Sequence, residues 1–368
     1  MKKYIIYTIC LFLLFAVKSK AQEFGYKPDK IHPVNMIMEA LLEKNVTDEE
    51  LFKTWVFMFK KEYNSITEEK QRFRNFQETV IEVKAHNANK QNTFRMGLNK
   101  FADMTYSEWI KTYFFDLNEQ KEKLSENMKD EWSVTGFRNF DITGPDSNPS
   151  IQLIDWSSKT GDVYDQQSCG SCYAHAAVNA IESNYYIKNG GTILKLARQQ
   201  IVDCSPLTGG CDGGFPQYVF FYAFKKGLML EKDYPYTATV GTCQYNSNKA
   251  VKGLLKGVIA PKYSSIGLEN FNNLYESLKN GPVAVTYNAS IHKNYSGGIV
   301  DTANCTSVNH AVLMVGLGYD SVTSRYYYII KNSWGTWWGE SGFFRAYVNN
   351  TGPVFSCFLE SYPNLSLA

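Results

Sequence analysis

The sequence has little net charge, no internal repeat and, after its first residues, no apolar run long enough to cross a membrane. Its 38 basic side chains nearly balance 36 acidic ones, so charge favours neither nucleic acid nor an anionic membrane as a partner. No cysteine occurs in residues 22–149, whereas seven of the eight cysteines follow residue 168. The two parts of the chain therefore differ, and 368 residues exceed the length of one average domain.

The first residues are typical of a secretory signal peptide. Two lysines precede an apolar stretch of 14 residues, 4–17, and Ser19 and Ala21 supply the two small side chains of a cleavage site. The stretch is shorter than the ~20 residues of a typical membrane span, although a signal anchor is the alternative. We expect cleavage after about Ala21. This predicts a protein of the secretory pathway, located in a lysosome or digestive vacuole or outside the cell.

The most informative segment reads QQSCGSCYA, at residues 166–174. Cys172 begins an alanine-rich run without Gly or Pro, and two glycines after Asn189 supply a stop signal. These features predict a helix from about Ser171 to Lys188 with Cys172 in its first turn. A helix N-terminus favours an anion, which matters because only the thiolate is a nucleophile and free cysteine has a pKa of ~8.5.

Three segments resemble those of papain-type cysteine proteases. Residues 169–173 (CGSCY) resemble the nucleophile segment, residues 307–312 (SVNHAV) the histidine segment and residues 331–335 (KNSWG) the asparagine segment. His310 follows Cys172 by 138 residues (310 − 172), inside the family's ~130–150, and Asn332 follows it by 160 (332 − 172). The order of Gln166, Cys172, His310 and Asn332 is that of the family. Taken singly, each has a more ordinary interpretation: a surface Gln, a disulfide or metal-binding Cys-x-x-Cys, a core His.

The resemblance implies an α+β fold of the papain-like, two-lobed kind, preceded by a mainly helical propeptide. A helical lobe would carry Cys172, and an antiparallel β-barrel-like lobe would carry His310. The sequence itself reads as helical to about residue 230 and then as strands near residues 283–287, 311–316, 326–331 and 342–348. Cys172 would be the nucleophile and His310 its ion-pair partner and proton donor, oriented by Asn332. Gln166 would stabilise the oxyanion with the Cys172 N–H.

The resemblance also implies a set of substrate-binding residues: Gly213, Gly214, Phe215, Thr286, Asn309, Ala311, Trp334 and Leu359. Leu359 would make the pocket for the second residue before the cut (P2) apolar, but Glu360 is adjacent and an alignment slip of one residue would reverse that expectation. Three residues depart from the family near the nucleophile: Gln167 replaces a usual Gly, Tyr173 a common Trp and His175 a usual Phe. We expect His175 to be a core histidine or to lie beneath the nucleophile.

The cysteine count predicts one free thiol. Once Cys10 leaves with the signal peptide, seven cysteines remain. Six paired cysteines allow fifteen connectivities, so the pairing is taken from the resemblance, which implies Cys169–Cys211, Cys204–Cys243 and Cys305–Cys357. The spacing does not fit a zinc site, because no second Cys-x-x-Cys and no paired histidines follow. No metal and no cofactor is expected.

Residues 22–149 resemble an inhibitory propeptide of the cathepsin L-like kind, with a helical core at about 47–110. A helix is predicted from Thr67 to about Asn89. The residues that match the family's two propeptide motifs are Glu68, Arg72, Phe76 and Asn87, then Gly97, Asn99, Phe101 and Asp103. Glu68 and Arg72 form a predicted i,i+4 ion pair. From about residue 112 the chain reads as a polar linker along the active-site cleft, and residues 150–368 form the peptidase domain.

The sequence therefore predicts a secreted or lysosomal cysteine endopeptidase made as a zymogen, with preference for an apolar P2 residue. The alternative is a catalytically silent papain-like binding or scaffold protein. Exopeptidase action is a narrower alternative, but a cleft-blocking insertion like that of cathepsin B is not evident. Expected partners are protein and peptide substrates, the propeptide and cystatin-like inhibitors, with no nucleic acid, no membrane span in the mature protein, and a monomeric state. Six N-glycosylation sequons occur, at Asn45, Asn288, Asn294, Asn304, Asn349 and Asn364.

Overall fold

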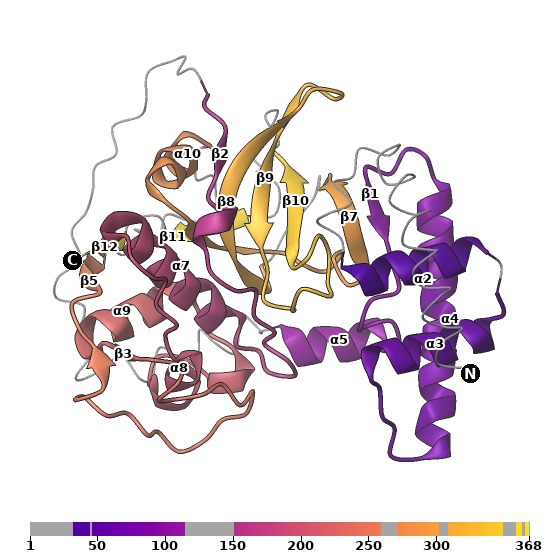
Figure 1. Cartoon of the computed structure of the whole chain (residues 1–368), viewed down its shortest axis with the longest axis horizontal. Helices are drawn as coiled ribbons and strands as arrows, with labels where there is room; N and C mark the ends of the chain where they lie inside the picture. Colours follow the sequence, from indigo (N-terminus) through magenta and orange to yellow (C-terminus); the bar gives the residue numbers. More distant parts are fainter. Residues whose placement is uncertain are drawn as a thin grey trace. The chain divides into compact units, whose positions relative to one another are not determined.

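The computed structural model describes residues 32–44, 46–114, 151–258, 271–301, 308–348, 358–362 and 365–367 (Figure 1). For residues 256–258, 271–273, 358–362 and 365–367 it describes the backbone only. The predicted signal peptide, the predicted Cys305–Cys357 disulfide and the sequons at Asn45, Asn304, Asn349 and Asn364 lie outside these residues. No described helix is long and apolar enough to cross a membrane.

The chain divides into two compact units, each with segments from distant parts of the sequence. The first unit comprises Met1–Ile110, Ile291–Asp301 and Trp334–Arg345, and the second comprises Lys111–Ser290, Thr302–Ser333 and Ala346–Ala368. The first unit therefore combines the predicted propeptide up to Ile110 with two segments of the predicted peptidase domain.

Helices dominate the propeptide part of the first unit. Its elements are α2 (Pro33–Glu43), α3 (Asp48–Phe59), α4 (Ile66–Ala88), β1 (Phe94–Met96) and α5 (Tyr106–Tyr113), the last of which ends in the second unit. The helix predicted at Thr67–Asn89 is confirmed as α4. Helix α2 precedes the predicted helical core, and α5 extends into the segment predicted as linker. Thr47 caps α3 through a reciprocal pair of hydrogen bonds with Glu50, which satisfies two backbone donors at the helix start.

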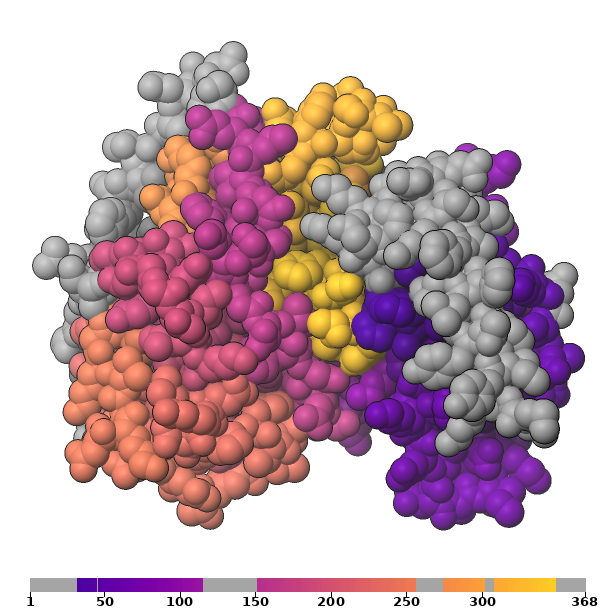
Figure 2. Space-filling model, viewed as in Figure 1, coloured from indigo at the N-terminus to yellow at the C-terminus, as the bar shows by residue number. Residues whose placement is uncertain are grey.

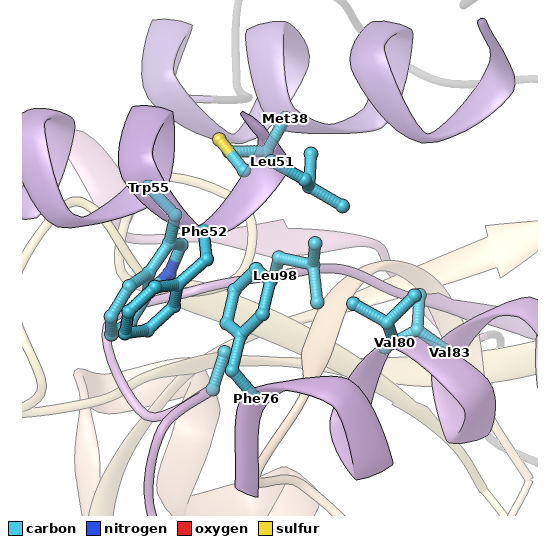
Figure 3. Close-up of a cluster of buried hydrophobic side chains, with 9 residues drawn as sticks. Met38, Leu51, Phe52, Trp55, Phe76, Val80, Val83 and Leu98 are labelled. Carbon is cyan, nitrogen blue, oxygen red and sulfur yellow. The ribbon is translucent and has the colours of Figure 1, made fainter. Parts of the chain in front are cut away.

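Nine buried side chains form the core of this unit (Figure 3). They are Met38, Leu51, Phe52, Trp55, Phe76, Val80, Val83, Leu98 and Ala102. The apolar stripes of α3 and α4 face each other here, because residues three and four apart lie on one side of a helix. The Trp55 indole N–H also donates to the Asn99 carbonyl (2.9 Å), which joins α3 to the second propeptide motif.

Ion pairs connect the helices of the first unit. Arg72 donates two parallel hydrogen bonds to Glu108, both 2.7 Å, whereas Glu68 lies 3.9 Å from Arg72 Nε. The predicted Glu68–Arg72 pair is thus present but longer than the bidentate pair with Glu108. Asp103 accepts a hydrogen bond from Lys61 Nζ (2.8 Å) and another from the Tyr63 hydroxyl (3.0 Å).

The propeptide part of the first unit is bonded to its peptidase part by strand pairing and side-chain hydrogen bonds. Strand β1 pairs antiparallel with β7 (Tyr295–Val300). Asn99 Nδ2 donates to the Lys293 carbonyl (2.7 Å), and Lys293 Nζ donates to the Met104 carbonyl (2.6 Å). Asn294 is 1% exposed and donates through Nδ2 to Glu82 (3.0 Å), so the sequon at Asn294 is inaccessible to glycosylation in this folded state.

The second unit begins with the helices that carry the predicted nucleophile. Its helices are α7 (Cys172–Asn189), α8 (Arg198–Cys204), α9 (Pro216–Lys226) and α10 (Phe271–Asn280), with short 3-10 turns η2 (Ser157–Lys159) and η3 (Gly210–Asp212). The observed α7 confirms the helix predicted from the alanine-rich run, and Gly190 ends it with φ +70°. Every residue of α7 from Cys172 to Ser183 is buried, because α8, α9 and β8 surround it. Residues 151–258 form a continuous surface in Figure 2, coloured from magenta to orange.

An antiparallel sheet forms the rest of the second unit. Its strands are β2 (Ile154–Asp155), β6 (Val283–Tyr287), β8 (His310–Asp320), β9 (Arg325–Lys331) and β11 (Phe358–Tyr362). The order is β9-β8-β6-β11, and β2 pairs with β8. Strand β10 (Phe343–Tyr347) begins in the first unit and ends in the second. Two smaller ladders join β3 (Leu228–Met229) to β4 (Ala250–Val251) and β5 (Leu255–Val258) to β12 (Leu365–Leu367).

Candidate active site

Cys172 is the first residue of α7 and is fully buried. Among the described cysteines it is the one outside a disulfide; the structure contains Cys169–Cys211 and Cys204–Cys243, two of the three predicted bonds. The loop before Cys172 is tied to η3, because the Gly170 N–H donates to the Cys211 carbonyl (2.8 Å). A Cβ at position 170 would lie 2.5 Å from that same carbonyl oxygen, so this close approach requires glycine.

His310 and Asn332 form a hydrogen-bonded pair at the ends of two neighbouring strands. His310 begins β8, and Asn332 follows the last residue of β9. His310 Nε2 lies 2.8 Å from Asn332 Oδ1, which also accepts the Ser333 N–H (2.8 Å). Since a backbone N–H can only donate, this second bond fixes the oxygen of the amide in that position, and His310 Nε2 must carry a proton. The Nδ1 side of the ring is therefore the basic one.

Burial keeps both reacting groups neutral in this structure. Burial raises the pKa of the Cys172 thiol to about 12, although the N–H groups of Ala311, Tyr173 and Cys172 itself act in the opposite direction. The Ala311 contact places the sulfur beside the residue that follows His310. Burial also lowers the pKa of His310 to about 4, against the hydrogen bond with Asn332, which raises it. At neutral pH the thiol is protonated and the imidazole is uncharged.

Gln166 presents its side-chain amide towards two carbonyl groups. Nε2 donates to the Cys169 carbonyl (3.0 Å) and to the Tyr113 carbonyl (3.1 Å), while Oε1 accepts from the Ser333 hydroxyl (2.7 Å). Because a carbonyl oxygen only accepts, the two carbonyl contacts fix which end of the amide is the donor. The residue is fully buried, and its backbone N–H donates to the Ser333 carbonyl (2.8 Å). Gln166 is thereby connected to the segment that carries Asn332.

The end of α5 covers this site. Tyr113 supplies the carbonyl that occupies a donor of Gln166, and the Phe114 ring packs edge-on against His310, with ring centroids 5.4 Å apart. Both residues are 7% exposed. The sequence did not point to them, because a main-chain acceptor exists at every residue and one aromatic residue in a polar segment carries no distinct signal. The residues at the end of the propeptide helix thus contact the histidine and the amide of the site.

Five other residues implied for substrate binding lie in the second unit. Gly213 has φ +117°, and a Cβ at Gly214 would lie 3.0 Å from atoms of Thr208 and Tyr173. Phe215 directly precedes α9 and is 2% exposed. Thr286 on β6 pairs directly with Ala311 on β8, and both are buried.

The remaining implied residues have clear backbone or ring contacts. Asn309 donates to the Ser290 hydroxyl (3.0 Å) and accepts the Ala289 N–H (2.9 Å). The Trp334 ring lies in the first unit, where it packs against Phe101 at 5.5 Å. For Leu359 only the backbone is described; strand pairing sets Glu360 opposite Thr286, with an irregularity between residues 358 and 360.

Buried polar residues form hydrogen bonds and an ion pair that hold α7 and the Asn332 segment in place. Glu182 and Arg198, both at most 2% exposed, pair at 2.8 Å and join α7 to α8. Lys331 donates to the carbonyls of Thr160 (2.7 Å) and Gly161 (3.1 Å) and to Asn179 (3.2 Å). Burial lowers the pKa of Lys331 to about 7. These bonds hold the residue next to Asn332 against α7, and sequence patterns did not identify them because the partners are far apart in the chain.

Comparisons with known proteins identify two domains. The family described as papain family cysteine protease matches residues 151–365, and the one described as cathepsin propeptide inhibitor domain matches residues 52–109. A cathepsin L-like proteinase of Phaedon cochleariae is 33% identical over 332 residues, which cover 87% of this chain and 95% of the relative. One of Fasciola hepatica is 32% identical over 326 residues, covering 86% and 94%. The solved structure of digestive procathepsin L 3 from Tenebrio molitor larval midgut superposes with a TM-score of 0.70 at 29% identity, covering 87% of this chain and 100% of that one.

Proposed function

The chain belongs to the papain family of cysteine proteases, and from this premise we propose that it is a secreted or lysosomal endopeptidase made as a zymogen. It is a peptide hydrolase with a propeptide inhibitor domain. The observation that carries the proposal is the position of Cys172 at a helix start beside the hydrogen-bonded His310–Asn332 pair. Phe114 packs against His310, and the Tyr113 carbonyl accepts from Gln166. Removal of the cover would open the site to water and substrate.

In the opened site, Cys172 is the nucleophile. Transfer of the thiol proton to His310 Nδ1 gives a thiolate and an imidazolium, stabilised by each other and, for the thiolate, by the N-terminus of α7. The sulfur forms a bond to the peptide carbonyl carbon, and the electron pair of the C=O double bond moves to oxygen. The Gln166 amide and the Cys172 N–H then donate to that oxyanion, which replaces the Tyr113 carbonyl at Gln166.

Collapse of the tetrahedral intermediate releases the amine. The C–N bond breaks as His310 Nδ1 donates its proton to the leaving nitrogen, which leaves an acyl-thioester on Cys172. A water molecule then attacks the thioester carbon while His310 accepts one of its protons. The C–S bond breaks, which releases the carboxylic acid, and the proton on His310 returns to the sulfur. Asn332 holds the imidazole in the orientation that serves both steps. A neutral amide suits this task, since a carboxylate would stabilise the imidazolium and weaken it as an acid.

Maturation would remove two segments, residues 1–21 as signal peptide and residues 22–149 as propeptide. The support for the second cut is that α5 ends at Tyr113 over the active site, while the papain family match begins at residue 151. The first residue of the mature enzyme would lie near Asn148 to Ile151. N-terminal sequencing of acid-processed protein checks this boundary.

Substrate preference would depend on an apolar P2 pocket formed by Phe215, Thr286, Ala311 and Leu359. The support is the burial of the first three residues and the direct pairing of Thr286 with Ala311. The backbone pairing of Glu360 with Thr286 is the specific observation that favours basic P2 residues instead. Gly213, Gly214, Asn309 and Trp334 complete the proposed substrate-binding set.

Active-site titration and mutation test the proposed function. Acid-processed enzyme should hydrolyse fluorogenic peptides, and a peptidyl epoxide should abolish that activity at one equivalent by labelling Cys172. The Cys172→Ala proform should neither process itself nor take up the label, while its thermal unfolding midpoint stays near that of the wild-type proform. Processed wild-type protein that neither turns over peptides nor takes up the label would support the scaffold alternative.

A further inference from the structure

A buried histidine lies beneath the first turn of α7, and the proposed chemistry does not use it. His175 is 3% exposed, and its Nδ1 lies 3.0 Å from the Ser171 carbonyl oxygen and 3.4 Å from Ser171 Oγ. Because a carbonyl oxygen only accepts, Nδ1 carries a proton and donates it. Burial, followed by the charge of Arg198, lowers the pKa of His175 to about 3, so the ring is neutral. His175 therefore acts as a fixed donor to the residue that precedes Cys172.

Ser171 continues this contact through a chain of hydroxyl groups. Ser171 Oγ lies 2.6 Å from the Tyr236 hydroxyl, which donates to the Gln166 carbonyl (2.8 Å). Since the single Tyr236 proton goes to Gln166, Ser171 Oγ must donate to Tyr236. The Tyr236 ring also packs edge-on against His175, with centroids 4.9 Å apart at 89°. The four residues form one connected group within the second unit.

The group spans the turn that carries both proposed oxyanion donors. Gln166 supplies the side-chain donor at one end, and Cys172 supplies the backbone N–H at the other. Between them Gln167 has φ +53°, a left-handed conformation that a residue with a side chain adopts less readily than glycine. The family usually has glycine at this position and phenylalanine at that of His175. This chain therefore has both a strained backbone conformation at Gln167 and a hydrogen-bond donor, His175, that a phenylalanine at this position could not supply.

We propose that His175 is a positioning residue for the oxyanion site, which it fixes through Ser171 and Tyr236. It touches neither substrate nor the reacting sulfur in this role. It sets the distance between the Cys172 N–H and the Gln166 amide, and both must converge on one oxygen for the tetrahedral intermediate to be stabilised. The inference rests on the proposed function, because it concerns the oxyanion donors of that same site.

Two substitutions remove the contacts while retaining aromatic rings. His175→Phe removes the donor to Ser171, and Tyr236→Phe removes only the hydroxyl that joins Ser171 to Gln166. Tyr222→Phe is the matched control, because Tyr222 is also buried and its hydroxyl accepts from Gln200 (3.2 Å) instead. Three measurements on acid-processed enzyme separate positioning from general damage: kcat and KM, the inhibition constant of a peptide aldehyde, and the rate of alkylation by iodoacetamide. A bound aldehyde places an oxygen in the oxyanion site, whereas alkylation by iodoacetamide does not need those donors.

His175→Phe and Tyr236→Phe should each lower kcat and weaken aldehyde inhibition about tenfold, since outright removal of an oxyanion donor costs ~10²–10³ in kcat. KM and the alkylation rate should stay within about twofold, as should every value for Tyr222→Phe. The double variant should lose little more than either single variant, because both changes break one connected group. The acid limb of the pH–rate profile should not move.

Unchanged aldehyde inhibition in the variants of an active wild-type enzyme would overturn the positioning role and leave the proposed function standing. Equal losses in alkylation and turnover would also overturn it, as would a shifted acid limb, which would give His175 a proton-transfer role. If His175→Phe does not fold, Tyr236→Phe and Ser171→Ala carry the same expectation and decide the matter. An inactive, unlabelled wild type is a separate result, which refutes the proposed function together with the inference built on it.

Discussion

Replacement of Phe101 by alanine should weaken the latency of the proform. Phe101 is fully buried in the first unit, where its ring packs against Trp337 at 4.9 Å, Trp334 at 5.5 Å and Trp109 at 5.9 Å. The first two tryptophans belong to the segment Trp334–Arg345 and the third to α5. One propeptide side chain therefore contacts both the peptidase segment of the unit and the helix that ends at Tyr113.

The magnitude follows from the size and burial of the side chain. A buried Phe→Ala change costs ~3–5 kcal/mol, including ~0.5–1.5 kcal/mol for each aromatic pair. About half of this free energy, ~1.5–2.5 kcal/mol, is assigned to the contact that keeps the propeptide bound. Its loss makes the state in which the propeptide no longer covers the active site about 10- to 70-fold more populated. The remainder destabilises the propeptide itself, which acts in the same direction.

The rate at which a peptidyl epoxide labels Cys172 in the intact proform at pH 7 measures this opening. Phe101→Ala should raise that rate about 10- to 70-fold if opening limits labelling. Phe57→Ala is the matched control, because Phe57 lies on α3 and is 65% exposed, so the same chemical change removes little buried contact. Processed Phe101→Ala enzyme, which lacks the mutated segment, should have the kcat/KM of the wild type.

A labelling rate for Phe101→Ala within twofold of the wild type would refute the reasoning, provided that the proform is folded by circular dichroism. An equal increase in Phe57→Ala would refute it in a different way, since it would show that the effect does not depend on burial.

Three further predictions concern the propeptide, the histidine pair and the P2 pocket. Partial burial raises the pKa of Glu108, but the hydrogen bonds and the charge of Arg72 outweigh that effect, so the pKa is lowered. The Arg72–Glu108 pair therefore stabilises the fold at pH values above the unfolded pKa of ~4.3. This stabilisation is lost as the pH falls through the folded pKa. Self-processing should therefore be faster in acid. Glu108→Gln should accelerate self-processing at pH 7 by up to about fivefold, as expected for the loss of ~1 kcal/mol in a partly exposed ion pair. A wild-type processing rate that does not depend on pH would contradict this reasoning. Asn332→Ala should lower kcat about 10²-fold, less than loss of the nucleophile, because His310 remains but is poorly oriented; a steady-state assay in which kcat is unchanged would exclude an orienting role. A panel of fluorogenic peptides that differ only at P2 should be cleaved with a graded preference for Leu, Val and Phe over Arg, since each methylene in an apolar pocket is worth ~1–3 kcal/mol. A preference for Arg that Glu360→Gln abolishes would instead place Glu360 in the pocket.

Local patterns predicted the parts of the fold that depend on residues near in sequence. The alanine-rich run ended by glycines became α7, because helix propensity and a stop signal act within a few residues. The helix predicted from Thr67 to about Asn89 is likewise present, as α4. The resemblance supplied the disulfides and the His310–Asn332 pair, which periodicity alone does not reveal.

The sequence did not predict the contacts that depend on tertiary structure. Arg72 was paired with Glu68 by the i,i+4 rule, yet its bidentate partner is Glu108, 36 residues away. The fold brings the two together, and a planar guanidinium matches a carboxylate better in that geometry than from one helical turn away. The sequence did not predict the contact of Tyr113 for a different reason, because Tyr113 contacts Gln166 through its backbone carbonyl oxygen, which every residue has. The register at Leu359 and Glu360 depends on an irregularity in strand pairing, which a residue pattern does not encode.

The latency of the proform should be chemical as well as steric, and a small reagent can show this. Burial raises the pKa of Cys172 to about 12 and lowers that of His310 to about 4, so proton transfer from sulfur to nitrogen is unfavourable while the cover remains. Water in the opened site stabilises both charged forms, which brings the two groups into the range where the ion pair forms. We therefore expect iodoacetamide to alkylate Cys172 in the processed enzyme at pH 5–7, and to react with the proform at least ~10²-fold more slowly, with Cys172→Ala as the background. If the proform, with its propeptide still attached, and the processed enzyme were alkylated at equal rates at pH 6, the propeptide would block substrate without altering the reactivity of the Cys172 thiol.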